Sequence, residues 1–114
     1  MAQLRRKPRT PFPYVLVEDR ERKEDEQARF IIAPPTERQW AEVVDDAPGN
    51  AAVLSEAVIR FVDRLEGHPD AEAFGESGSK ERRAFVDECM GLERIRELGN
   101  AIADTMLSER ERKN

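Results

Sequence analysis

Two short apolar runs near the N-terminus are separated by a long, highly charged segment. Tyr14–Val17 and Phe30–Ile32 consist of aromatic, β-branched and aliphatic residues of the kind that favour strands. Between them, residues 18–26 contain six acids, three bases and no apolar residue. Prolines border both runs and disfavour helices there. The pattern predicts an antiparallel β-hairpin over residues 12–33, with the charged segment as its tip.

Beyond the hairpin, apolar residues recur at helical spacing. Thr36 and Gln39 are spaced as in a capping box, in which each side chain accepts a hydrogen bond from the other residue's backbone N–H. Leu54, Val58, Phe61 and Leu65 follow one another at spacings of four, three and four positions. This spacing predicts a second helix with these residues as an apolar stripe on one face. The predicted helices cover residues 37–46, 51–66, 80–89 and 92–108.

The third predicted helix and the loop before it complete the expected architecture. Residues 68–79 are rich in Gly, Ser, Pro and acids, which predicts a loop with a single turn around residues 71–74. In the helix that follows, Ala84, Phe85 and Cys89 are expected to face inward. The elements predict an α+β fold, in which an N-terminal antiparallel β-hairpin is followed by a small bundle of three to four α-helices. Residues 11–114 are expected to form one domain, preceded by a flexible basic arm at residues 1–10.

Charge is distributed unevenly along the chain. The 114 residues include 19 Lys and Arg against 24 Asp and Glu, which gives a net charge of −5. Residues 1–10 carry a charge of +4, so the rest of the chain carries −9. This balance argues against nucleic acid as the main partner, because phosphate binding needs clustered positive charge. The basic arm is interpreted as a solvated tail, with docking on an acidic partner surface as the alternative.

Few residues have the spacing that catalysis or metal binding requires. His68 and Cys89 are the single histidine and the single cysteine, 21 positions apart, and match neither a paired metal motif nor a catalytic motif. Cys89 is interpreted as a small core residue. The clustered carboxylates are typical of solvated surface. We therefore expect no enzymatic activity, no cofactor and no metal.

The tripeptide His68-Pro69-Asp70 matches one that J-domain co-chaperones carry between two antiparallel helices. In that family the preceding helix is basic, whereas residues 51–66 contain both arginines and acids. The tripeptide is therefore interpreted as a helix stop followed by a turn.

Amphipathic helices either close a core or dock on another protein, and spacing alone leaves both roles open. In the last predicted helix, Ile95, Leu98, Ile102 and Met106 form an apolar stripe. This stripe lies near the chain end, where it could serve as an adaptable contact surface for a partner. The candidate partner-binding residues are Trp40, Phe61, Leu98, Ile102 and Met106.

The order of segments carries a resemblance to a known family. The chain reads PFPYVLVEDRE, a charged connector ending in Gln27, ARFIIAPPTERQWAEV, and finally ERIRELGNAIADTMLSERERKN. Together these segments resemble tail assembly chaperones of long-tailed bacteriophages and prophages. The resemblance is strongest at Tyr14–Arg20, Phe30–Gln39 and Leu92–Asn114.

The resemblance implies a non-enzymatic role during tail morphogenesis. Its expected client is the tape measure protein, with tail tube subunits as a second candidate, bound until the tail tube polymerises. A permanent virion part, such as a neck or tail connector, and a regulator of a host enzyme are the alternatives. A lone cysteine fits a reducing compartment, here the bacterial host cytoplasm. We expect no membrane segment and no secretory signal, and we expect self-association as an additional property.

Overall fold

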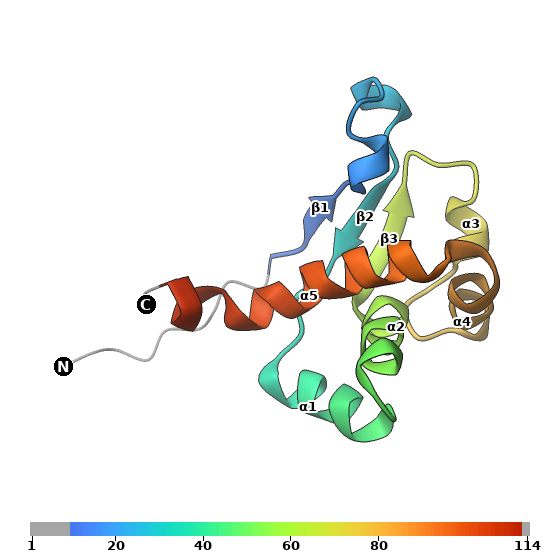
Figure 1. Cartoon of the computed structure of the whole chain (residues 1–114). Helices are drawn as coiled ribbons and strands as arrows, with labels where there is room; N and C mark the ends of the chain where they lie inside the picture. Colours follow the sequence, from blue (N-terminus) through green and yellow to red (C-terminus); the bar gives the residue numbers. More distant parts are fainter. Residues whose placement is uncertain (1–9, 113–114) are drawn as a thin grey trace.

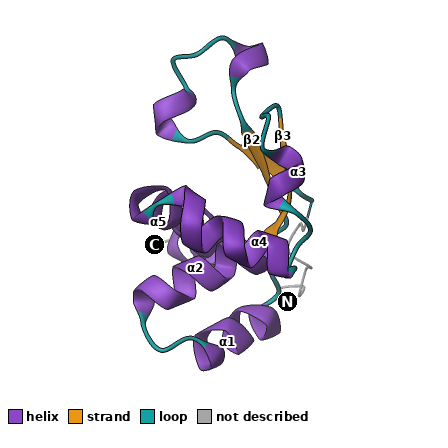
Figure 2. Ribbon diagram, turned by 90° about the vertical axis from the view of Figure 1, so that its right-hand side faces the viewer, coloured by secondary structure: helices purple, strands orange, loops and turns teal. Residues whose placement is uncertain are grey.

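The computed structural model describes the backbone of residues 10–112 and the side chains of residues 10–106. The arm expected at residues 1–10 therefore lies, apart from Thr10, outside the described residues. The described chain is α+β, as expected, with a three-stranded antiparallel sheet in the order β1-β2-β3. Figures 1 and 2 show α2 and α5 packed on one face of this sheet, with the hairpin tip projecting beyond the helices.

The predicted hairpin is confirmed, with shorter strands than the apolar runs. β1 (Phe12–Tyr14) pairs with β2 (Arg29–Ile32), and Tyr14 lies opposite Phe30. After Tyr14 the chain leaves the sheet and forms two 3₁₀ turns, η1 (Val17–Asp19) and η2 (Glu24–Glu26). β1 ends before the apolar run does, because Leu16 turns into the core, where it is 3% exposed, while Val17 is exposed to solvent.

The second predicted helix is wrong over its last five residues. α2 covers Asn50–Phe61, and Val62–Glu66 forms β3, an edge strand that pairs with β2. Val62 and Leu65 lie opposite Ile32 and Phe30, which buries both side chains against the helices. Leu65 thus fits a helical stripe and a strand face equally well, and pairing with β2 decides between them.

The last turn of α2 is closed by groups from distant parts of the sequence. Gly78 N–H donates to Ile59 O at 2.8 Å, Ser77 Oγ donates to Arg60 O, and Ala33 N–H donates to Phe61 O at 2.8 Å. Carbonyls at a helix end have no partner within the helix, so these donors allow the helix to stop there. None of them is adjacent in sequence, which explains why no local stop signal marks the boundary.

The first predicted helix is confirmed at both ends. α1 covers Glu37–Asp46, directly after Thr36. Gln39 N–H donates to Thr36 Oγ1 at 2.9 Å, and Thr36 N–H donates to Gln39 Oε1 at 2.8 Å. The capping box therefore forms as the sequence predicts.

The third predicted helix forms, but its inward face is different. α3 (Ala71–Phe74) is the expected single turn, and α4 (Lys80–Phe85) continues into a π-helical turn, η3 (Val86–Met90). The buried residues are Arg82, Val86 and Met90, whereas Ala84 and Cys89 are exposed and Phe85 is half-buried. The expectation that Cys89 is a core residue is therefore wrong. The face of α4 and η3 that carries Arg82, Val86 and Met90 points into the core.

α5 (Leu92–Arg112) begins as expected and extends four residues further than residues 92–108. It crosses α2 closely at Gly99, where an added Cβ would lie 2.7 Å from Leu54 Cβ and 3.0 Å from Leu54 Cα. Leu98 and Ile102, on the same face, are fully buried in the core that the sheet and helices share.

Candidate functional site

The candidate partner-binding residues divide between core and surface. Phe61, Leu98 and Ile102 are 7%, 0% and 0% exposed, and their side chains belong to the hydrophobic core. Trp40 is half-buried and packs against the core, and Met106 is half-buried near the end of the described side chains. The apolar stripe of α5 is thus used between α5 and α2, because that contact closes the core.

A groove of about 290 Å³ lies where the hairpin tip faces η3 and the first turn of α5. We call it the tip groove. Its floor is apolar and is formed by Leu16, Ala28, Phe30, Leu65, Phe85 and Met90. Its rim is charged and is formed by Glu18, Asp19, Arg22, Glu26, Asp70 and Arg94.

Glu97 fixes the base of the hairpin tip to α5. Its Oε2 atom accepts a hydrogen bond from the Tyr14 hydroxyl at 2.8 Å and another from Val17 N–H at 2.9 Å. Burial, together with the neighbouring Glu97 carboxylate, raises the pKa of Tyr14 above its usual value. The tip thus leaves the sheet at a point that a side chain of α5 determines.

Arg94 fixes the rim of the tip groove. Its guanidinium forms an ion pair with Glu18 on η1, with a contact of 3.4 Å to Oε2, and donates to Met90 O at 3.0 Å. The hydrogen bond from Arg94 to the Glu18 carboxylate lowers the pKa of Glu18. Two side chains one turn apart on α5, Arg94 and Glu97, therefore hold the wall of the groove in place.

The single histidine and the single cysteine both line the tip groove. Asp70 N–H donates to His68 Nδ1 at 3.0 Å, which closes a turn after β3. His68-Pro69-Asp70 thus forms a turn, as expected, although it follows a strand instead of a helix. Among the described residues, no group of three His, Cys, Asp or Glu side chains is placed to hold a metal ion.

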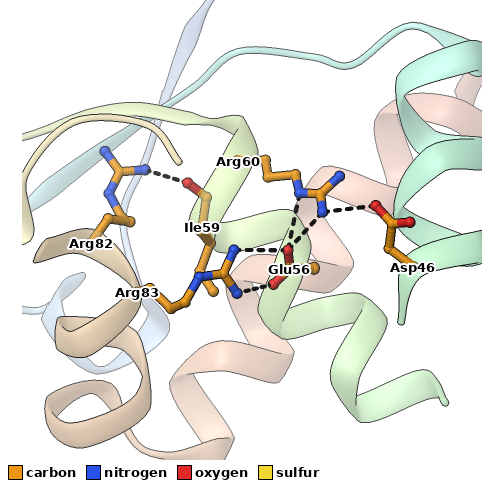
Figure 3. Close-up of polar contacts among 6 residues, drawn as sticks. All are labelled: Asp46, Glu56, Ile59, Arg60, Arg82 and Arg83. Atoms are coloured by element: carbon orange, nitrogen blue, oxygen red, sulfur yellow. Dashed lines mark hydrogen bonds and ion pairs between the residues drawn. The ribbon is translucent and has the colours of Figure 1, made fainter. Parts of the chain in front are cut away.

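A second polar cluster joins three helices on another side of the molecule. Glu56 on α2 accepts hydrogen bonds from Arg83 on α4, at 3.1 Å, and from Arg60, at 3.0 Å. Arg60 also reaches Asp46 on α1, at 3.1 Å (Figure 3). The Arg83 hydrogen bond is the main cause that lowers the pKa of Glu56. Because these charges pair with one another, the cluster serves to hold helices together.

Arg82 is completely buried and was not predicted from the sequence as a structural or site residue. Its guanidinium lies 3.9 Å from the centre of the Phe74 ring. It donates to five backbone oxygens, those of Val58, Ile59, Val62, Phe74 and Gly75. Burial lowers its pKa to about 10, so the group stays charged at neutral pH. Its four-residue spacing from Val86, and that of Val86 from Met90, places Arg82 on the same helix face as these two apolar residues. The sequence signal is ambiguous, because arginine is ordinarily found at the surface.

No protein-family model, curated protein or solved structure matches this chain. Within the described residues, no helix combines the length and apolarity that crossing a membrane requires.

Proposed function

We propose that this chain is a non-enzymatic tail assembly chaperone of a long-tailed bacteriophage. It binds the tape measure protein in the bacterial host cytoplasm until the tail tube polymerises, with tail tube subunits as a second candidate client. The observation that carries the proposal is the tip groove, which combines an apolar floor with a charged rim and a wall fixed to α5. Such a surface suits temporary binding of an apolar segment from another protein.

The three segments that carry the family resemblance all contribute to the tip groove. Tyr14–Arg20 supplies the tether to Glu97 and part of the rim. Phe30 lies on the floor, and Arg94 closes the rim from α5. This coincidence supports placing the client site at the groove.

The groove gives a physical account of chaperone action. An apolar client side chain gains stability when it leaves water, by about 25 cal/mol per Å² of apolar area buried. The rim charges stay in contact with solvent, and the whole chain carries a net charge of −5, which favours solubility of the complex. The client is thereby shielded from aggregation without any chemical change.

Co-purification with the tape measure protein of the same phage tests this proposal. Cys89→Arg places a large side chain at an exposed position in the groove, and Ala84→Arg places the same side chain at an exposed position outside it. We expect C89R to lower the amount of co-purified tape measure protein by about tenfold or more, a loss of about 1.4 kcal/mol of binding free energy. A84R should retain the wild-type amount.

Two results would contradict the proposal. One is a wild-type chain that retains no tape measure protein, and the other is equal binding by both arginine variants. Mass spectrometry of purified particles separates the proposal from a permanent neck or tail connector. A chaperone should be absent from the particles, whereas a connector must be present.

A further inference from the structure

The charges on the rim of the tip groove do not balance. The rim has four carboxylates, Glu18, Asp19, Glu26 and Asp70, against the two guanidinium groups of Arg22 and Arg94. With His68 counted as neutral, the rim therefore has a net charge of −2.

Both arginines of the rim are already engaged by carboxylates. Arg94 pairs with Glu18, and Arg22 lies 3.4 Å from Asp19. Within the described part of the chain, Glu26 forms no ion pair, and the nearest basic group to Asp70 is the His68 ring at 3.8 Å. Two carboxylates of the rim are thus available to a cationic partner: Glu26 at the end of η2 and Asp70 after β3.

The volume and the apolar floor of the tip groove restrict the size and chemistry of an occupant. At about 290 Å³ the groove lies at the lower limit for small-molecule sites, which span roughly 300 to 1,000 Å³. Its floor offers apolar contact mainly from the half-buried Phe85, with the accessible edges of Phe30 and Leu65, which are 5% and 6% exposed. An apolar side chain from a peptide fits both the volume and the surface.

We infer that the tip groove selects basic amphipathic helices, in which an apolar anchor residue enters the groove and flanking Lys or Arg side chains meet Glu26 and Asp70. Residues three and four positions apart share a helix face, so one helix can present the anchor and both cations together. This inference rests on the proposed function, because it specifies which segments of the tape measure protein the groove takes. It also predicts that acidic helices of equal apolarity are rejected.

Peptide binding tests the inference directly. Two fluorescein-labelled helical peptides of about 18 residues share the same leucine positions and carry either Lys or Glu at the flanking positions. We expect the Lys peptide to bind the full-length chain at least about tenfold more tightly at low salt, and to lose part of this advantage at higher salt.

Charge reversal on the protein completes the test. Glu26→Lys/Asp70→Lys should remove or invert the preference, because both side chains are exposed and their replacement leaves the floor intact. Glu37→Lys/Glu42→Lys makes the same change in net charge on exposed positions of α1, outside the groove, and should retain the preference. Circular dichroism checks that each variant is folded.

The outcomes distinguish this inference from the proposed function. Equal binding of both peptides, or an equal loss in the α1 control, would overturn the inference even if C89R still releases the tape measure protein. Retained peptide preference with no binding of the tape measure protein would overturn the proposed function alone. If C89R abolished dimers of the chain in light scattering and left peptide binding unchanged, the occupant would be a second copy, which would also overturn the inference.

Discussion

The Arg82 guanidinium lies where two helices end. It donates to the carbonyls of Val58, Ile59 and Val62 at the end of α2, and to those of Phe74 and Gly75 at the end of α3. Helix C-termini carry partial negative charge, so a buried cation is stabilised there without a carboxylate partner. One side chain thereby positions α2, α3 and α4 relative to one another.

Replacement of Arg82 should be costly. We expect Arg82→Met to destabilise the fold by about 3 to 5 kcal/mol, because it leaves buried carbonyls without donors. Arg82→Lys should restore only part of this, since one ammonium group cannot reach both helix ends. The matched control is Arg83→Met, whose side chain is 48% exposed and should cost about 1 kcal/mol or less. Urea unfolding measures each value, and a smaller loss for R82M than for R83M would refute the role assigned to Arg82.

Tyr14 reports on the tether between the hairpin and α5. Burial and the Glu97 carboxylate favour its neutral form, so its pKa lies above the usual value of 10. Glu97→Gln keeps an acceptor but removes the negative charge, and should lower this pKa. The chain has a single tyrosine, so tyrosinate absorbance at alkaline pH follows it without interference. Glu93→Gln, on the same helix, is the control, and a wild-type pKa at or below 10 would contradict the assigned contact.

At the scale of elements, the close crossing of α2 and α5 depends on one glycine. Gly99 is buried within α5, and the backbone and side chain of Leu54 occupy the space that a Cβ would need. Glycine has low helix propensity, so its presence in the middle of a helix is explained by this approach.

Gly99→Ala should therefore destabilise the protein despite its better helix propensity. The expected loss is about 1 to 3 kcal/mol, the range observed when a well-packed interface is overfilled. Asn100→Ala, at the next and exposed position, raises helix propensity without a packing conflict, and should be neutral or stabilising. Thermal and urea unfolding give both values. Equal stability of the two variants would show that the helices can separate without cost.

The boundary between α2 and β3 shows how far a local pattern can be trusted. Leu54, Val58, Phe61 and Leu65 satisfy helical spacing, yet the helix ends at Phe61. Its end is set by donors from residues 33, 77 and 78 and by pairing of β3 with β2. Each of these partners is more than ten residues away in sequence, so the stripe alone cannot reveal them.

On the scale of the whole molecule, Glu56 links α1, α2 and α4 through two arginines. Its carboxyl has a lowered pKa in the folded chain, mainly because of the Arg83 hydrogen bond. A lowered carboxyl pKa contributes stability above the unfolded value of about 4.5, and this contribution is lost as the pH falls through the folded value.

Glu56→Gln should therefore be less stable than the wild type at pH 7, by about 1 kcal/mol. The difference should shrink below about pH 4.5 and vanish once the folded carboxyl is protonated. Urea unfolding from pH 3 to 7 measures this convergence. Glu72→Gln, at an exposed position on α3, is the control. A difference that stays constant over this pH range would exclude an electrostatic role for Glu56.

The sequence by itself determined those features that depend on neighbours within a few residues. The capping box of α1, the core of the hairpin, the single turn at residues 71–74 and the start of α5 are all encoded by local propensity, spacing and caps. These signals also give the α+β class.

Tertiary structure decided the rest. The third strand, the inward face of α4 and the tip groove all depend on contacts between segments that are distant in sequence, such as Arg82 with α2 and Arg94 with Glu18. The apolar stripe of α5, expected in part to meet a partner, closes the core against α2. The client site proposed here is lined instead by side chains of the hairpin tip, β3, η3 and the first turn of α5. Periodicity shows which residues share a face, but only the packed chain determines what that face meets, because burial depends on the partners that folding brings together.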